Sequence, residues 1–325
     1  SLNNVTYQYD TTDNLMADVD GNIRYYGASP DNYIYFNCSD YSNQSSSTCE
    51  TWRIIGVFDG KVKIMRNEII GNIAYDDDEE DTYLQSIARD NDGNNSRVEL
   101  LKYNISDEET IIKLAPELPP FGAGQNDYSK SSLQKILNNY YYNSLKYTGN
   151  STYDFTNAGL KNDTTRNMIA ETTYYTRGYD YPGIYVDAMY DKERVSGTVE
   201  SGNATTWTGK IAVPYPSDYG YAADLSLCQH TLAGYDDNSY PCVGNNWMES
   251  ILTNNGADKG SLVTPNSGDV GDAWGIDSNG SVFSSNPTMK GVSGPLLITP
   301  VLSLTSELDI GSGSGTSSNP YQLNV

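Results

Sequence analysis

The chain is poor in histidine and lacks the short motifs of common enzyme classes. Its only histidine, His230, lies next to Cys228 in a polar loop, and nothing else supports a Ser-His-Asp or Cys-His site built on it. GxGxxG and GxxxxGK[ST] are absent, so no nucleotide cofactor is indicated. Paired carboxylates carry no information in a chain with 42 acidic residues. We therefore predict no catalytic residues, no cofactor and no enzymatic activity.

Long apolar runs and positive charge are also scarce. No stretch of 18 apolar residues occurs, so direct membrane insertion is not expected. No charged and apolar leader opens the sequence, so a signal or anchor would have to lie outside these residues. The 42 acidic against 20 basic residues give a formal charge of -22, which repels phosphate backbones. Nucleic acid is therefore not expected as a partner.

Cysteine is rare, and its spacing argues against two common roles. Cys38 and Cys49 flank the stretch CSDYSNQSSSTC, and Cys228 and Cys242 flank CQHTLAGYDDNSYPC. A thioredoxin-type redox motif needs a closer pair, and structural zinc sites group their ligands in short-spaced pairs. A zinc site assembled from both distant loops is the weaker alternative, and we predict no metal site.

The simpler interpretation is two local disulfides. Four cysteines allow three pairings, and pairing Cys38 with Cys49 and Cys228 with Cys242 has the lowest closure cost. Each bond would stabilise the fold by about 3 kcal/mol. Disulfides persist in oxidising surroundings, which predicts an extracellular or bacterial cell-surface location. The alternative is four buried thiols in a cytosolic protein.

Aromatic residues are plentiful, and the first part of the chain has the pattern of β structure. The apolar fraction is only 37%, but 28 tyrosines, 4 tryptophans and 5 phenylalanines offer large areas to bury. Strands are expected over IRYYG, YIYF, WRIIGVF and KVKIMR, with hairpin turns at Asp20-Gly21 and Asp59-Gly60. This pattern predicts an antiparallel sheet tied by the first disulfide.

Residues 74–122 interrupt this pattern with DDDEED, DNDGNNS, a short helical SDEETIIKLA and a proline-rich end. We interpret them as an acidic insertion. Four residues match positions 3, 5, 6 and 12 of an EF-hand calcium loop, namely Asp90, Asp92, Gly93 and Glu99. The first and eighth positions, Ala88 and Asn95, do not fit, so a solvated acidic turn is the simpler explanation. Asp18 and Asp20 form a weaker candidate, because Asp20-Gly21 serves the hairpin.

Helices and further strands follow the insertion. Asp127 or Ser129 is expected to cap a helix over 131–147, Asp163 a helix over 164–175, and Pro182 to begin a helix over 182–194. The last third has short helices at PSDYGYAADLS and NNWMESIL among strands, and residues 311–325 are expected to be a flexible Gly/Ser stretch with a short apolar tail. This order predicts an α+β fold in one domain spanning 1–325.

A polar stretch near the C-terminus is the candidate recognition surface. It places short polar groups beside one indole, among turn-forming glycines. The candidate ligand-binding residues are Asp269, Asp272, Trp274, Asp277, Asn279, Ser281, Ser284, Ser285 and Asn286. Exposed hairpins have the same composition, and Trp274, as the one large ring, is the member expected to lie in the core.

Several segments together resemble a group of bacterial secreted or surface proteins. They include YIYFNCSDYSNQSSSTCETWRIIGVFDGKVKIMRNE, DFTNAGLKNDTTRNMIAE, TTWTGKIAVPYPSDYGYAADLS and TPVLSL with SSNPYQL. The resemblance implies a C-type-lectin-like fold of the formylglycine-generating-enzyme type, with antiparallel sheets, several helices and long loops. Variable proteins of diversity-generating retroelements share this fold and diversify a C-terminal hairpin to bind new ligands.

By this resemblance, Leu262–Pro265 corresponds to the first strand of the C-terminal region, Ala273-Trp274 to the hairpin, and Pro300-Val301-Leu302 to the closing strand. Thr299 stands where the group has arginine, and Asp, Gly, Ser and Pro replace the tyrosines expected around the hairpin. These departures weaken the expectation of a ligand surface there. Formylglycine-generating activity is not implied, because such enzymes rely on reactive cysteines.

Two functional hypotheses follow. The first is an extracellular adhesin-like or receptor-like domain that binds an unidentified protein or glycan at the cell surface through its C-terminal hairpin and loops. The alternative is a structural subunit of a bacterial surface filament or layer, in which Tyr140–Tyr142, Tyr174-Tyr175 and the segment 179–190 make protein contacts. Self-association is expected only in the second case.

Overall fold

The protein has a mixed α+β architecture in which most strands are antiparallel and the helices are short. The computed structural model describes residues 2–76, 126–149, 151–237, 241–269, 271–284 and 295–325. The predicted α+β class is confirmed at this level.

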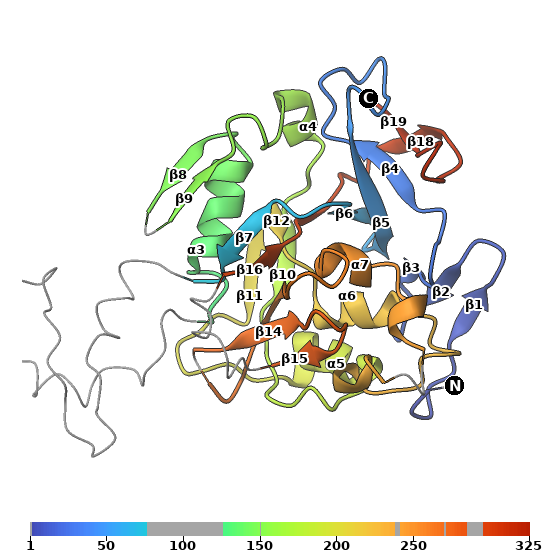
Figure 1. The fold of residues 1–325 in the computed structure, drawn as a ribbon, viewed down its shortest axis with the longest axis vertical. Coiled ribbons are helices and arrows are strands. Elements are labelled where there is room, and N and C mark those ends of the chain that lie inside the picture. The colour runs from blue at the N-terminus through green and yellow to red at the C-terminus, as the bar shows by residue number, and fades with distance from the viewer. Residues whose placement is uncertain (1, 77–125, 150, 238–240, 270, 285–294) are drawn as a thin grey trace, which may run out of the picture.

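The largest sheet is eight-stranded and combines both ends of the chain (Figure 1). Its order is β1 (Gln8–Asp10), β2 (Leu15–Ala17), β3 (Ile23–Tyr25), β5 (Glu50–Phe58), β6 (Lys61–Arg66), β17 (Val301–Ser303) and β12 (Ile211–Ala212), while β4 (Tyr33–Phe36) also pairs with β5. The predicted turn between β5 and β6 is confirmed, since Asp59 and Gly60 have φ angles of 50° and 73°. Late strand β17 lies between β6 and β12 and so joins the C-terminal region to the first sheet.

A second sheet holds the C-terminal hairpin. Its order is β15 (Val282–Phe283), β14 (Ala273–Ile276), β13 (Gly260–Pro265), β16 (Pro295–Ile298) and β7 (Gly71–Ala74). The continuous apolar run at 295–304 is divided between the two sheets, because Thr299 and Pro300 separate β16 from β17. One chain segment therefore links both sheets.

Three two-stranded ribbons account for the other strands of the described residues. They are β8 (Lys146–Thr148) with β9 (Thr152–Asp154), β10 (Thr172–Tyr175) with β11 (Thr206–Gly209), and β18 (Asp309–Ser312) with β19 (Gln322–Asn324). In β10–β11, Tyr174 lies opposite Trp207. β10 contributes side chains to the site described below.

The helices are shorter than the sequence predicts. Those described are α3 (Ser132–Lys135) continued by η3 (Ile136–Tyr141), α4 (Asp163–Asn167), α5 (Val186–Asp191) continued by η4 (Lys192–Ser196), α6 (Pro216–Tyr221), η5 (Leu232–Gly234), η6 (Val243–Asn245) and α7 (Glu249–Leu252). Among the described residues, no helix is long and apolar enough to cross a membrane.

Several predicted helix boundaries are wrong. The first helix is capped by Ser131, not by Asp127 or Ser129, and α4 is capped by Asn162, not by Asp163. The expected helix over 164–175 ends early, because the β-branched Thr172 and Thr173 pair with β11 instead. The third helix begins at Val186, beyond Pro182.

The core is one continuous cluster of buried residues that includes Leu2 and Leu323. Trp52 and Trp274 are fully buried, and many tyrosines, among them Tyr128, Tyr141 and Tyr219, are equally inaccessible. The aromatic rings thus supply the apolar area that a chain with few aliphatic residues needs.

Both local disulfides are present. Cys38 is bonded to Cys49 and Cys228 to Cys242, so no free cysteine remains and the zinc, free-thiol and Cys-His alternatives are wrong. Among the described residues, no group of acidic, histidine or cysteine side chains is arranged to hold a metal ion. The calcium-loop pattern of residues 88–99 lies outside the described residues.

The prediction of a flexible stretch over residues 311–325 is wrong. Part of residues 311–325 forms the β18–β19 ribbon, which Figure 1 shows beside β4. The Tyr35 amide donates to the Tyr321 carbonyl at 2.9 Å, and Leu323 is only 4% exposed. The short apolar tail is therefore part of the core.

Candidate functional site

The residues predicted to form a recognition surface lie at different depths. Asp269 and Asn279 are exposed, whereas Asp272, Asp277 and Ser281 are half-buried. Trp274 is fully buried, as its size suggested, and Ser284 is also buried. The remaining two candidates, Ser285 and Asn286, lie outside the described residues.

Polar side chains of this hairpin are largely engaged in holding its own turns. Asp269 accepts the Gly271 amide at 2.8 Å, Asp277 accepts the Ser278 amide at 2.8 Å, and Asn279 accepts from both the amide and the hydroxyl of Ser281. These bonds stabilise local backbone. Of the described hairpin candidates, only Asp269 and Asn279 are favoured as ligand contacts, and the reason is their exposure, since their oxygen atoms already accept hydrogen bonds within the turns.

The buried members bind other parts of the chain. Trp274 donates its indole N–H to the Tyr179 carbonyl at 2.8 Å, and the Ser284 hydroxyl donates to the Asp180 carbonyl at 2.8 Å. They connect the hairpin to the segment before α5. Neither side chain contributes to an exposed face.

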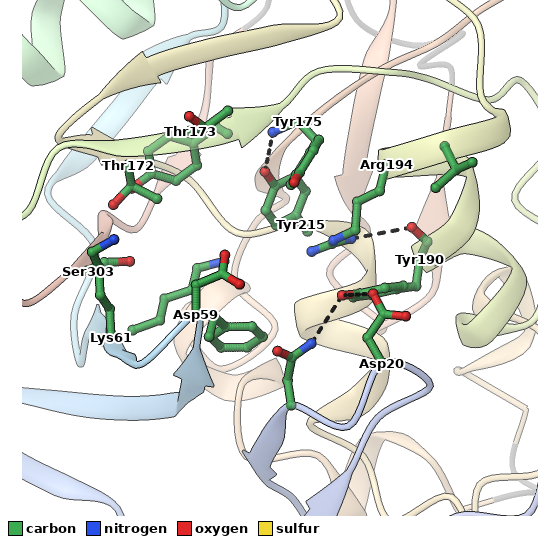
Figure 2. Close-up of a pocket in the computed structure, with 15 residues that line it drawn as sticks. Asp20, Asp59, Lys61, Thr172, Thr173, Tyr175, Tyr190, Arg194, Tyr215 and Ser303 are labelled. Carbon is green, nitrogen blue, oxygen red and sulfur yellow. Dashed lines mark hydrogen bonds between the residues drawn. The ribbon is translucent and has the colours of Figure 1, made fainter. Parts of the chain in front are cut away.

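A cleft of about 470 Å³ lies elsewhere, between the first sheet and the β10 to α6 region (Figure 2). One wall comes from the β5–β6 hairpin with Phe58, Asp59, Lys61 and Lys63, and the opposite wall from β10, α5 and η4. Its volume falls within the range of about 300 to 1,000 Å³ typical of small-molecule sites. Six separate parts of the chain meet here.

Arg194 is a cation of the cleft wall that its neighbours hold in one position. Its side chain is 12% exposed, and its guanidinium lies 3.7 Å above the ring centre of Tyr190 and 4.7 Å from that of Tyr215. Nη1 donates to Glu193 Oε2 at 2.5 Å, to the Tyr190 carbonyl at 3.4 Å and to Ser217 Oγ at 3.5 Å. Ring stacking and hydrogen bonds therefore fix the guanidinium in place.

Glu193 is the anion that holds Arg194. It is completely buried and accepts from both the amide and the hydroxyl of Ser217, at 2.8 Å and 2.5 Å. Burial raises the pKa of Glu193, while Arg194 and Ser217 act in the opposite direction. The hydrogen bonds between Glu193 and Ser217 link η4 to the start of α6.

A buried network of ion pairs supports the floor of the cleft. Lys63 contacts Asp218 at 2.5 Å, and Arg24 contacts Asp218 at 3.0 Å and Asp18 at 2.7 Å. Burial alone would raise the pKa of Asp218, but Lys63 and Arg24 outweigh it and lower this pKa to about 2. The Asp18 carboxylate thus accepts hydrogen bonds from Arg24 and from the turn that follows it. The pair Asp18 and Asp20 in the sequence is therefore explained without a metal ion.

Some polar groups at the rim of the cleft bond to one another, and others have no such bonds among the described residues. Tyr190 donates its hydroxyl to Asp20 at 2.9 Å and accepts from Asn22 at 3.1 Å. Burial raises the pKa of the Tyr190 hydroxyl, which therefore stays protonated and donates. Within the part of the chain that the structure describes, Lys61 and Asp59 have no ion pair or side-chain hydrogen bond. They are available to a bound molecule.

Sequence reasoning missed this cleft. Its residues come from the turn at Asp20, the β5–β6 hairpin, β10, α5 with η4, Tyr215 before α6 and Ser303 of β17, and no motif unites them. The one available signal was the Tyr-rich segments, of which Tyr174 is buried and Tyr175 is 37% exposed. Comparison of the chain with protein-family models, characterised proteins and solved structures finds no match.

Proposed function

We propose that this chain is an extracellular ligand-binding domain of the C-type-lectin-like class, and that the cleft around Arg194 is its binding site. The observation that carries the proposal is the fixed guanidinium in a cleft whose rim offers polar groups with no partner among the described residues. Ligand sites are usually concave and preformed, with a few placed polar groups, and this cleft fits that description. Two disulfides are compatible with an extracellular protein.

The proposal places binding in the cleft in preference to the C-terminal hairpin. Hairpin carboxylates and amides are largely committed to turn amides, whereas Lys61 and Asp59 have no such bonds in the described chain. Tyr175 adds an exposed ring at the same site. The hairpin stays a prediction that the same experiment can test.

A glycan and protein array probed with the intact domain is the first test. The ligand it selects is then measured against a cleft variant, Lys61→Ala with Tyr175→Ala, and a hairpin variant with Asp269, Asp272, Asp277 and Asn279 changed to alanine. We expect the cleft variant to lose about tenfold or more in affinity, and the hairpin variant to bind like the parent. Melting temperatures of both variants control for folding. The opposite pattern would return the site to the hairpin.

The alternative function, a subunit of a surface filament or layer, rests on exposed apolar side chains. Tyr181 is 62% exposed and Val195 69% exposed, and both belong to the segments around α5. Exposed apolar groups mark a partner contact where they form a continuous patch. Mass measured in solution over a range of concentrations separates the two functions, because a binding domain stays monomeric and a subunit forms polymers.

A further inference from the structure

We propose that the cleft binds an acidic saccharide, with the ligand's carboxylate on Arg194 and its hydroxyls on the rim. This inference rests on the proposed binding function and specifies its ligand class.

The free edge of Arg194 matches a carboxylate. All hydrogen bonds of this side chain to described residues use Nη1, which leaves Nε and Nη2, the two donors of one edge. Figure 2 shows the guanidinium reaching from the η4 side toward the centre of the cleft. Two parallel N–H donors are the arrangement that binds a carboxylate through both of its oxygens.

The guanidinium is also prepared before the ligand arrives. Tyr190 and Tyr215 lie against it, and Glu193 and Ser217 hold Nη1, so little side-chain freedom is lost on binding. A flexible exposed arginine would lose more. The protein therefore maintains a mostly buried cation whose second edge has no partner in the described chain.

Local charge favours a single negative charge over several. The cleft is lined by the cations Lys61, Lys63 and Arg194 and by the carboxylates Asp20 and Asp59, in a chain with a formal charge of -22. Glu193 already pairs with Arg194 and Asp218 with Lys63, so Lys61 is the lining cation without a carboxylate partner among the described residues. Lys61 can balance one ligand carboxylate that binds the free edge of Arg194. A phosphate or sulfate dianion would be repelled more strongly by the two rim carboxylates.

The rim carboxylates need donors, and hydroxyls supply them. One oxygen of Asp20 accepts from Tyr190, and Asp59 has no side-chain partner among the described residues. Ser303 lies at the β6 side of the cleft and Thr172 on β10, where each hydroxyl can exchange hydrogen bonds with a ligand. A molecule with one carboxylate and several hydroxyls satisfies both sets of groups, and this is the chemistry of an acidic sugar.

The decisive comparison is between one sugar acid and its neutral ester. Titration calorimetry of the whole chain with methyl β-D-glucuronide and with its methyl ester isolates the carboxylate, because the ring and hydroxyls stay the same. The methyl α-glycoside of N-acetylneuraminic acid provides a second acid, and inorganic phosphate and sulfate provide anions without hydroxyls. Each acid is compared with its own methyl ester, and we expect at least one acid to bind about tenfold or more tightly than its ester.

Arg194→Lys tests the forked contact, since it keeps the charge beside Glu193 and removes the paired donors. The variant is expected to lose about tenfold or more in affinity for the acid, and to leave the weak binding of the ester unchanged. If Arg194→Lys does not fold, Lys61→Gln serves instead. Its matched control is Lys146→Gln, which removes an equal charge on the exposed β8 strand, outside the cleft.

Equal affinity for acid and ester would overturn the inference, as would unchanged affinity in the variant. Binding of phosphate or sulfate alone would show a general anion site and would also overturn it. If no acidic sugar binds, but a ligand from the array is lost in the Lys61→Ala, Tyr175→Ala variant, this inference fails and the proposed function stands. If no array ligand depends on the cleft, the proposed function fails as well.

Discussion

At the scale of single residues, the cleft depends on charges that the protein buries and pairs. Arg194 is held by Glu193, and Lys63 and Arg24 share Asp218. Removing one partner of a buried pair leaves the other charge uncompensated, which typically costs about 3 to 5 kcal/mol. Substituting one of these residues should therefore reduce stability, whereas substituting a ligand-contacting residue at the rim should not.

Asp218→Asn gives a prediction with a defined pH dependence. The pKa of Asp218 is lowered from 3.8 to about 2 in the folded protein, so its carboxylate stabilises the fold above about pH 4 and this contribution is lost as the pH falls toward 2. The parent should be more stable than the variant by about 3 to 5 kcal/mol at pH 7. Urea unfolding at pH 7 and pH 3 should show this difference shrinking by about 1 kcal/mol. A difference that does not change between these pH values would contradict the shift.

Trp274 and Asn279 test the division of the hairpin into core and surface. Trp274 is fully buried and donates to the Tyr179 carbonyl, so Trp274→Ala should reduce the free energy of unfolding by about 3 to 5 kcal/mol. Asn279 is exposed, and Asn279→Ala should cost about 1 kcal/mol or less. Chemical denaturation measures both. Similar losses in the two variants would show that the hairpin is not divided in this way.

At the scale of elements, local rules predict the strands better than the helices. The Asp59-Gly60 turn and the β-branched and aromatic residues of β5 and β6 are short-range signals, and the structure follows them. The first residue of a helix depends on which side chain the tertiary structure allows to cap the N-terminal amides. Asn162 caps α4, although Asp163 beside it is an equally suitable residue type. The β10 strand formed where a helix was expected because β11, distant in sequence, offers a partner.

The C-terminal ribbon shows a further limit of composition. Its Gly/Ser-rich sequence predicts flexibility. In the structure, however, Tyr321 bonds to β4 and Leu323 is buried, and no local sequence pattern reveals these contacts. The cleft was missed for the same physical reason. Its lining residues range from Asp20 to Ser303, and only tertiary contacts bring them together.

Leu323→Ala and Val325→Ala test the packing of this ribbon. Leu323 is 4% exposed and Val325 is 64% exposed, so the first change removes buried methyl groups and the second does not. We expect a loss of about 2 to 4 kcal/mol for Leu323→Ala and less than about 0.5 kcal/mol for Val325→Ala. Thermal unfolding followed by circular dichroism compares them. Two neutral substitutions would restore the interpretation of a flexible tail.

At the scale of the whole molecule, the two sheets share one core. We predict that the acidic insertion that precedes α3 is not needed for this core to fold. Its described flanks are anchored: Tyr75 donates its hydroxyl to the Asn126 carbonyl at 3.3 Å, and Asp76 accepts the Ser132 amide at 2.9 Å. These contacts bring the flanks together without the intervening residues.

Replacing residues 78–124 with a short Gly/Ser bridge should therefore leave a domain that melts cooperatively near the parental temperature. Loop length changes closure entropy only slowly, and the anchors on both sides are retained. Calorimetry reports the cooperativity, and binding of the array ligand reports the cleft. A broad or absent transition would show that the segment contributes to the core.

Hydrogen exchange of the intact chain tests whether the ligand binds in the cleft around Arg194. Exchange is followed by mass spectrometry with and without the glycan or protein that the array selects. We predict added protection in β10 and η4, at Thr172–Tyr175 and Lys192–Ser196, with little change in the hairpin from Ala273 to Phe283. Protection confined to that hairpin, with β10 and η4 unchanged, would contradict the account.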